Sequence, residues 1–541
     1  MTQDRDDRRE QHRERDRHDR HDRFRQDEPH DRDERHAADT AHDQAAHGRA
    51  RGAQEMTDRT AVLIVGAGPV GLATACALWQ RGVPARIVEA QDGPQRGSRA
   101  VQLHAPTLRI FRELGILDEA GRRGLRIRSN QYHLAGGRTL KIGLGTLNEP
   151  LMLPQEITCE LLEQRLTELG GRVERGVTVT KVAGYDDAVT VHADGPEGEL
   201  RIEADWLVAA DGVRSRVREQ LGIGFEGADV PVTFLLAEGT VAGRPADDAV
   251  HYFLGLGGSV VFASMPGDRV RISAAVPPEH PLTRDGVQSL LDERGPGGLR
   301  IRSLDTVNNF SSQERIAARL RAGRVFLVGD AAHTHSPLGG QGLNLGLQDM
   351  HNLTWKLAGV VNGTLRAAVL DTYEPERRAA AEQIVANTHR FLKVFTLGPA
   401  AARVRNTVWG TLDAAGVLGR WFAPLLAGWQ VRYPAGPAGG GRWTAPARRG
   451  LPAAGTRSAR WAASPHGDDR FRLLTIGSAG LAHVRAAEEL AARHPGLLSH
   501  RHTGRGAPGF LLLRPDGYVA AGGATSAEWA ELEALFAAVA P

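Results

Sequence analysis

One short stretch, AVLIVGAGPVGLATACALWQRG at residues 61–82, constrains the fold more than any other part of the chain. Its first five residues are apolar and predict a buried strand, and the run after the glycines predicts a helix. A GxGxxG turn joins them: its first glycine permits a tight bend, its second lets a pyrophosphate approach the backbone, and its third lets helix and strand pack closely. The residues of the turn that we expect at a cofactor are Gly66, Gly68, Pro69, Val70 and Gly71.

A second apolar segment, PARIVEA, supplies the acidic residue that such a unit needs. It ends at Glu89, 18 residues after Gly71. A carboxylate there accepts hydrogen bonds from an adenosine ribose and disfavours a 2′-phosphate. The resident nucleotide is therefore NAD or FAD.

Two further corners choose between these cofactors. The strand-like segment before Asp211 leads into an Asp-Gly pair, and residues 325–328 lead into Gly329 and Asp330. A carboxylate after such a strand can bind a polyol hydroxyl. A second glycine cluster then opens a helix whose dipole favours anionic character. FAD has both a ribitol chain and a ring edge that becomes negative on reduction, whereas NAD has no ribitol, so this pattern favours FAD. The cluster contains Gly339, Gly340 and Gly342.

Composition limits the other classes of function. The 541 residues are 41% hydrophobic and carry a net charge of +3, which fits a globular protein of two or three domains and gives little support to nucleic-acid binding. Residues 1–55 alternate charged residues and histidine, so we expect a disordered tail. Cys76 and Cys159 are too few for a disulfide scaffold and have no metal-ligand neighbours, and no secretory signal is present. A cytoplasmic protein without a metal site or membrane span is expected.

These motifs together resemble those of the class A flavoprotein aromatic monooxygenases, the class of para-hydroxybenzoate hydroxylase and phenol hydroxylase. The closest resemblance is to the subgroup of aromatic polyketide hydroxylases. It rests on GAGPVGL with Glu89, on the Asp-Gly pair at Asp211, and on Gly329-Asp330 followed by HTHSPLGGQGLNLGLQD.

The resemblance implies an α/β fold with three domains. A Rossmann-like FAD-binding domain would be discontinuous, at residues 57–230 and 316–400. An antiparallel β-sheet substrate domain would be inserted at residues 231–315. A C-terminal thioredoxin-like domain without a CxxC motif would occupy residues 430–541.

The resemblance also assigns roles to residues. Arg99 and Gln155 would contact FAD, and Asp211 would serve both FAD and the pyridine nucleotide. Asp330 would hold the ribitol, and Pro337 would lie against the flavin ring. The pyrimidine edge would be lined by Gly339, Gly340, Gly342, Leu343 and Asn344. Pro106 departs from the family pattern, which often has an arginine there.

No catalytic side chain is fixed by the sequence, because the resemblance places the chemistry on the flavin. His335 and Pro337 are candidates near the expected ring, whereas His333 is expected to pack or cap behind the Gly-Asp turn. The segment 373–395 predicts one long helix. Substrate contacts are sought on the strand-like segments of the inserted domain, where ordinary sheet packing competes with that role. The candidates are Tyr252, Phe253, Phe262 and Met265.

The implied reaction begins when NADPH or NADH reduces the flavin. O2 then adds at C4a, and the hydroperoxide hydroxylates a polycyclic phenol of the polyketide type, as in antibiotic biosynthesis. No second GxGxxG is present, so the nicotinamide is expected to bind transiently. Two alternatives stay open: a Baeyer-Villiger oxygenase of similar substrates, and a non-catalytic flavin-binding scaffold. A homodimer also stays open.

Overall fold

The structure of the protein is a computed structural model in which every described residue belongs to one compact unit, Thr57–Pro541. The described residues are 58–94, 100–244, 248–255, 258–395, 397–434, 451–457, 469–477, 481–504 and 508–541. The predicted tail at 1–55 and Arg99 lie outside them. Within these ranges, none of the helices combines the length and apolar character that a membrane span requires.

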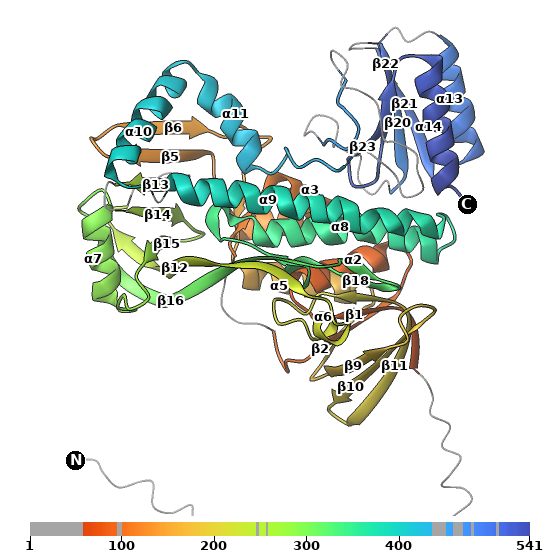
Figure 1. Ribbon diagram of the computed structural model, residues 1–541, viewed down its shortest axis with the longest axis horizontal. Coiled ribbons are helices and arrows are strands. Elements are labelled where there is room, and N and C mark those ends of the chain that lie inside the picture. The colour runs from red at the N-terminus through yellow and green to blue at the C-terminus, as the bar shows by residue number, and fades with distance from the viewer. Residues whose placement is uncertain are drawn as a thin grey trace, which may run out of the picture. The chain divides into compact units, whose positions relative to one another are not determined.

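The first sheet carries the glycine-rich corners, in the order β17-β18-β11-β1-β2-β8, with β10 and β9 joined to β11 (Figure 1). Because β18, β11, β1, β2 and β8 are parallel neighbours, their carboxyl ends lie at one edge of the sheet. The strands are β1 (Asp58–Val65), β2 (Ala85–Glu89), β8 (Val173–Arg175), β9 (Thr178–Ala183), β10 (Val189–Gly195), β11 (Gly198–Ala209), β17 (Arg321–Ala322) and β18 (Val325–Leu327).

Helices cover this sheet, and three of them, α2, α5 and α8, contact one another in the pairs α2–α8 and α2–α5. The predicted helix at 373–395 is confirmed as α9, which lies beside α8 (Figure 1). The helices are α2 (Pro69–Gln80), α3 (Ala105–Glu113), α4 (Leu117–Arg123), α5 (Gln155–Glu168), α6 (Arg216–Gln220), α8 (Gly342–Val361) and α9 (Tyr373–Phe395). Short elements here are β3 (Gln102–Leu103), β4 (Leu125–Arg126), β7 (Leu151–Met152), η1 (Gly329–Ala331), η2 (Leu338–Gly340) and η3 (Ala367–Thr372).

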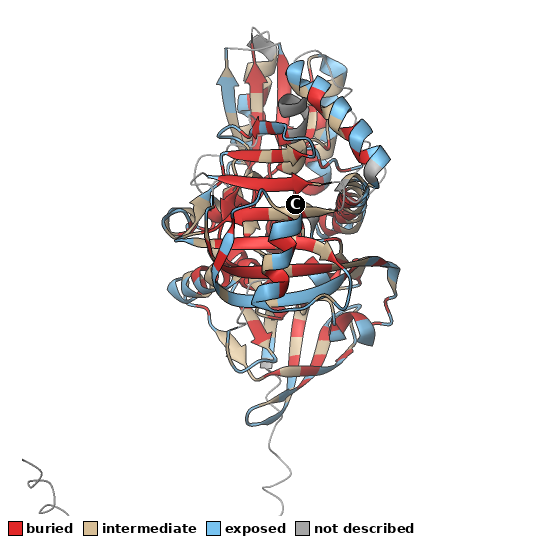
Figure 2. Ribbon diagram, turned by 90° about the vertical axis from the view of Figure 1, so that its left-hand side faces the viewer, coloured by how far each residue is buried: buried red, intermediate tan, exposed pale blue. Residues whose placement is uncertain are grey.

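The second sheet has the order β19-β16-β12-β15-β14-β13-β5-β6. It extends beyond the expected range of 231–315, because β5 and β6 come from residues 129–143 and β5 pairs in parallel with β13. Buried residues follow the strands, whereas the outer helices carry many exposed residues (Figure 2). The strands are β5 (Ser129–Leu134), β6 (Thr139–Gly143), β12 (Phe225–Ala242), β13 (Ala249–Leu254), β14 (Ser259–Ser264), β15 (Arg269–Val276), β16 (Arg300–Ala317) and β19 (His333–Thr334).

The two faces of this sheet pack against different helices. On one face, a cluster that includes Phe262 also includes Val287 and Leu290 of α7 (Arg284–Arg294). On the other face, a cluster that includes Tyr132 also includes Ala423 of α11 (Val417–Leu426). Trp409 of α10 (Pro399–Ala414) packs against this cluster.

The C-terminal segment forms a four-stranded sheet in the order β21-β20-β22-β23. Its chain makes a β-α-β unit with parallel strands and then a β-β-α unit with antiparallel strands. Phe471 packs edge-on against Trp355 of α8, with 5.4 Å between ring centroids, so this segment shares the core of the first sheet. Its elements are β20 (Phe471–Ile476), α13 (Leu481–Arg493), β21 (Leu498–Thr503), β22 (Gly509–Leu513), β23 (Val519–Gly523) and α14 (Ser526–Val539).

Candidate cofactor site

The first glycine corner has the geometry that its sequence predicts. Gly66 has φ of +101°, and a Cβ on it would lie 2.5 Å from the carbonyl oxygen of Ala210. A Cβ on Gly71 would lie 1.9 Å from the carbonyl oxygen of Gly66, so only glycine allows α2 to start so close to β1. Gly68 differs, because a Cβ there would meet nothing within 4 Å. The backbone at Gly68 therefore faces open space at the start of α2, where a pyrophosphate fits.

Glu89 lies against this corner at the end of β2. Its Oε2 accepts a hydrogen bond from the backbone N–H of Ala67 at 2.7 Å, and its Oε1 accepts one from the N–H of Gln91 at 3.0 Å. The carboxylate is thus held beside the start of α2, which begins with Pro69. This is the position that a ribose hydroxyl would need.

Asp211 follows β11 and carries a buried polar atom without a partner. Its Oδ2 accepts a hydrogen bond from the N–H of Val217 at 3.1 Å, while its Oδ1 has no hydrogen-bond partner within the described part of the chain. Burial raises the pKa of this carboxyl above its usual value. A buried carboxylate oxygen with no donor is costly, so a ligand hydroxyl that donates to it would fit here.

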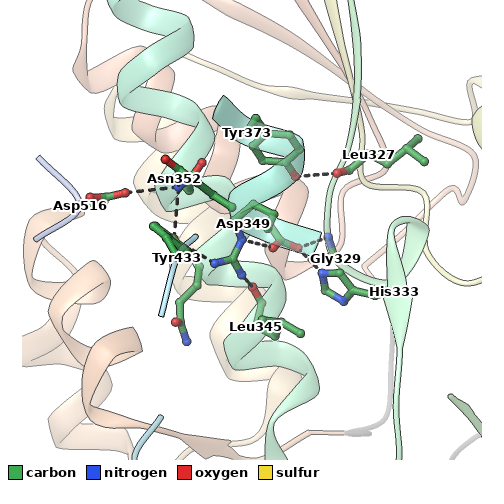
Figure 3. Close-up of polar contacts among 12 residues, drawn as sticks. Leu327, Gly329, His333, Leu345, Asp349, Asn352, Tyr373, Tyr433 and Asp516 are labelled. Atoms are coloured by element: carbon green, nitrogen blue, oxygen red, sulfur yellow. Dashed lines mark hydrogen bonds and ion pairs between the residues drawn. The ribbon is translucent and has the colours of Figure 1, made fainter. Parts of the chain in front are cut away.

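The second corner, at Gly329 and Asp330, is hydrogen-bonded to a buried carboxylate of α8. Asp349 Oδ2 accepts hydrogen bonds from the N–H of Gly329 at 2.9 Å and from Nε2 of His333 at 2.7 Å (Figure 3). Burial works against the charge of Asp349, but His333 and Arg377 outweigh it and lower the pKa of Asp349. His333 is buried and supports the turn as predicted, and Asp330 beside it is exposed.

The two corners meet directly. Val70, at the start of α2, lies 3.2 Å from where a Cβ on Gly329 would be and 2.8 Å from where one on Gly346 would be. Gly346 lies on α8, and its Cβ would also approach the Cα of Gly329 to 3.0 Å. Small residues at both positions let the second corner pack onto the first. One extended dinucleotide can therefore reach both.

The glycine cluster before α8 is held by Asn344, which the sequence analysis selected, and by His104 and Thr107, which it did not. His104 is buried at the start of α3, and its Nε2 lies 2.8 Å from the carbonyl oxygen of Gly339. Burial lowers the pKa of His104 to about 4, so the ring is neutral and donates this hydrogen bond. Asn344 accepts hydrogen bonds through Oδ1 from the N–H of His104 and from Oγ1 of Thr107, both at 2.7 Å. The side chain of Asn344 is fully buried and orders the loop.

Gly340 and Gly342 are partly exposed in this loop, and Leu343 packs on the main core beside them. Gly340 has φ of +61°, and its carbonyl oxygen accepts a hydrogen bond from Nδ2 of Asn344 at 2.7 Å. In the sequence, only the polar residues His104 and Thr107 of QLHAPT hinted at these contacts with Asn344. The two segments are 240 residues apart, so no local pattern joins them.

His335 presents an unsatisfied nitrogen beside this loop. Its Nδ1 lies 2.7 Å from the carbonyl oxygen of Ser336, so Nδ1 carries the proton and donates. Its Nε2 is buried with no hydrogen-bond partner among the described residues, 3.6 Å from where a Cβ on Gly342 would be. Burial lowers the pKa of His335 to about 4, so Nε2 is an acceptor at neutral pH. Pro337 is exposed two residues further on.

Gln155 begins α5, and its Oε1 accepts a hydrogen bond from the N–H of Ala100 at 3.3 Å. Arg99, the neighbour of Ala100, lies outside the described residues. The structure thus brings Gln155 to the backbone of Ala100.

The four substrate candidates divide between the two faces of the second sheet. Tyr252 and Met265 belong to the cluster that includes α11, and the ring of Tyr252 stacks on Tyr132 with 4.7 Å between centroids. Phe253 and Phe262 belong to the opposite cluster, against α7. Tyr132 was missed by the sequence analysis because β5 lies outside the range assigned to the inserted domain.

Comparison with known proteins agrees with this geometry. Residues 59–388 match the model of the family described as FAD binding domain. The chain belongs to this family. The matched residues include both glycine corners, Asp211 and the glycine cluster before α8. The unpaired Oδ1 of Asp211 and the open space at Gly68 fit a bound FAD.

Three proteins of known name are similar to this chain in sequence or in structure. The 12-dehydrotetracycline 5-monooxygenase/anhydrotetracycline 6-monooxygenase of Streptomyces rimosus subsp. rimosus is 33% identical over 400 residues, which are 69% of this chain and 77% of that protein. The crystal structure of the flavin-dependent monooxygenase PieE in complex with FAD and substrate has a TM-score of 0.71 at 25% identity, covering 88% of this chain and 98% of that chain. The anhydrotetracycline hydroxylase OxyS from Streptomyces rimosus has a TM-score of 0.68 at 29% identity, covering 89% and 99%.

Proposed function

We propose that this chain is an FAD-dependent, NAD(P)H-consuming monooxygenase that hydroxylates a polycyclic aromatic substrate of the polyketide type. The observation that supports the proposal is the close approach of Val70 to Gly329 and Gly346, which brings together the two corners that we propose as cofactor-binding. The related proteins are named as monooxygenases and a hydroxylase, and two of these names refer to tetracycline precursors. None of these names favours the Baeyer-Villiger or scaffold alternative.

The residues of this chain would share the work of binding. The start of α2 would face the pyrophosphate, Glu89 the ribose and Asp330 the ribitol, while Asp211 would accept a hydrogen bond at Oδ1. The start of α8, with Gly339, Gly340 and Gly342, would present N–H groups and a helix dipole to the pyrimidine edge. The proposed set is completed by Arg99, Gln155, Pro337, Leu343 and Asn344.

When bound, FAD supplies the two-electron redox chemistry by which NAD(P)H and O2 are consumed and one oxygen atom enters the substrate. The chain's own contribution is to orient the aromatic ring and keep water out. Tyr252 and Met265 share their face of the second sheet with α11. Leu426 of α11 accepts a hydrogen bond from Nε2 of Gln341 at 3.0 Å, beside the glycine cluster, which supports this face as the one for the substrate. His335 Nε2 would accept a hydrogen bond from a hydroxyl or N–H of a bound ligand.

The test begins with an absorption spectrum of the purified protein. NADPH and NADH oxidation in air is then followed with anthracycline, angucycline and tetracycline precursors. Flavin bands with substrate-stimulated oxidation and a new phenol, identified by NMR, are expected. A lactone or ester product would replace the hydroxylase by the Baeyer-Villiger alternative. A protein that binds no added FAD would refute the cofactor assignment.

The C-terminal segment is part of the proposal as a thioredoxin-like domain. Its β-α-β unit followed by a β-β-α unit supports this assignment. Both cysteines of the chain lie elsewhere, at Cys76 and Cys159, so the domain would have no dithiol chemistry. Both are free and buried, and a chain without a disulfide is compatible with the cytoplasmic location that we propose.

A homodimer is supported by one helix. Val404, Val408 and Leu412 are spaced four residues apart on α10 and are 65%, 48% and 38% exposed. A two-fold axis through Val408 would place Val404 opposite Leu412 of a second copy, which joins apolar to apolar side chains. Light scattering should give a dimer for the native chain and a monomer for Val408→Glu. A monomeric native chain would contradict the dimer.

A further inference from the structure

A turn of the C-terminal segment enters a buried network of charges beneath the second glycine corner. Arg514 and Asp516 lie between β22 and β23, and their side chains are only 4% and 2% exposed. Arg514 donates two hydrogen bonds to Glu376 of α9, from Nη1 to Oε1 at 2.5 Å and from Nη2 to Oε2 at 2.9 Å. It also holds Asp516, at 2.5 Å from Nη2 to Oδ2. The turn is therefore fixed to α9 by paired charges.

Asn352 of α8 connects Asp516 of this turn to Tyr433. Its Nδ2 lies 3.4 Å from Oδ2 of Asp516 and 3.2 Å from the hydroxyl oxygen of Tyr433 (Figure 3). The same hydroxyl accepts a hydrogen bond from Nη1 of Arg377 at 3.1 Å. Nε of Arg377 then donates to Oδ1 of Asp349 at 2.6 Å.

Asp349 completes the connection, because its other oxygen binds the N–H of Gly329 and the ring of His333. Polar contacts thus run without a break from Asp516 to the residue that precedes Asp330. Each side chain between these ends is buried. In a low-dielectric interior such bonds polarise one another, and loss of one link weakens its neighbours.

The charges in this region balance, with three cations and three anions. Because all six side chains are buried, a group that lost its partner would remain as an uncompensated charge. The network therefore favours one arrangement of the turn, α8, α9 and the Gly329 loop. The six are Lys356, Arg377, Arg514, Asp349, Glu376 and Asp516.

We propose that the Arg514–Asp516 turn positions the Gly329–Asp330 corner through Tyr433, Arg377 and Asp349, so that the C-terminal segment sets how tightly the flavin half of FAD is held. This inference rests on the proposed placement of the ribitol at Asp330. It gives the C-terminal segment a role in cofactor binding without any contact between that segment and FAD. Arg514, Asp516 and Tyr433 are thus positioning residues.

Two tyrosines that stack on each other provide a matched pair of variants. The rings of Tyr433 and Tyr518 lie 3.8 Å apart, but the hydroxyl of Tyr518 is buried without a hydrogen-bond partner in the described part of the chain. Tyr433→Phe removes a link, whereas Tyr518→Phe removes the same atom from the neighbouring ring and no link. Both variants keep the stack and the volume.

The measurement is the Kd of the apoprotein for FAD, by fluorescence titration well below the unfolding temperature, together with the absorption spectrum of the bound flavin. Tyr433→Phe should weaken FAD binding about 3- to 30-fold and shift the flavin bands, in line with measured couplings through packed networks. Tyr518→Phe should bind as the native chain does. A lower melting temperature of Tyr433→Phe with unchanged Kd and spectrum would overturn the proposal, because the network would then be only structural.

Asp516→Asn tests the C-terminal end of the connection. It should weaken FAD binding in the same direction, and the double variant with Tyr433→Phe should lose less than the product of the two single effects, because both changes break one connection. Independent, multiplicative effects would overturn the proposed connection. A native chain that binds no FAD would instead overturn the cofactor assignment, on which this inference depends.

Discussion

Gly68→Ala should separate cofactor binding from folding, because Gly68 is the one glycine of the GxGxxG turn where the structure leaves room for a methyl group. Its φ is −70° and its ψ is 176°, which alanine adopts readily, and a Cβ would meet no atom within 4 Å. Alanine at a compatible position restricts the unfolded chain, so the apoprotein should be stabilised by about 0.4–1 kcal/mol.

FAD binding should change in the opposite direction. The methyl group would occupy the space through which a pyrophosphate approaches the first N–H groups of α2. Hydrogen bonds to a charged group contribute about 1.5–3 kcal/mol each. Loss of one such bond corresponds to a roughly 10- to 150-fold higher Kd, since 1.4 kcal/mol is a factor of ten.

Urea unfolding of the apoprotein and fluorescence titration with FAD would give the two quantities separately. Gly121→Ala is the matched control: it lies in α4, its Cβ also meets nothing within 4 Å, and it should gain about 1 kcal/mol of helix stability with no change in Kd. Gly68→Ala that binds FAD within twofold of the native chain would refute the placement of the pyrophosphate at α2.

Three further outcomes are expected. Gly71→Ala should lower the free energy of unfolding by about 1–3 kcal/mol or more in a urea titration, since its Cβ would overlap the carbonyl oxygen of Gly66; native-like stability would contradict this close approach. Asp349→Asn should cost about 3–5 kcal/mol in the same assay, because Arg377 would be left as a buried charge facing a neutral amide, and a loss below 1 kcal/mol would count against the network. The free energy of unfolding should also fall as the pH is lowered from 4.5 to 2. Burial opposes the charge of Glu376, but Arg514 and Lys356 outweigh it and lower the pKa of Glu376 from 4.5 to about 2. The unfolded chain therefore binds more protons in that window, and up to about 3 kcal/mol of stability is lost. Unfolding midpoints that stay constant from pH 4.5 to pH 2 would contradict that last expectation.

Local patterns predicted the parts of the site that depend on neighbouring residues. The turn at Gly66, the position of Glu89 at a strand end and the long helix α9 all follow from spacing within one or two elements. The packing of His333 behind the turn was also accessible, although its ring bonds Asp349 and it is Asp349 that accepts from the N–H of Gly329. Its partner was not, because Asp349 lies on a helix that begins only after a second glycine turn.

Contacts between distant segments could not be read from the sequence. β5 pairs with β13 across more than a hundred residues, so Tyr132 and its stack on Tyr252 lay outside the predicted domain. The network under the flavin corner has the same origin, since Asp516 and Asn352 are 164 positions apart. No periodicity in either segment indicates the other.

The substrate candidates could have been narrowed by strand geometry alone. Successive residues of a strand point to opposite faces of the sheet, so Tyr252 and Phe253 cannot both face one pocket. The structure agrees, because Tyr252 packs with α11 and Phe253 with α7. The period of two thus divides the candidates into two sets, but it does not say which set faces the substrate. That choice requires contacts between distant segments, which only the folded chain provides. Leu426 of α11 accepts a hydrogen bond from Gln341 beside the glycine cluster, which favours the face that α11 covers, with Tyr132, Tyr252 and Met265.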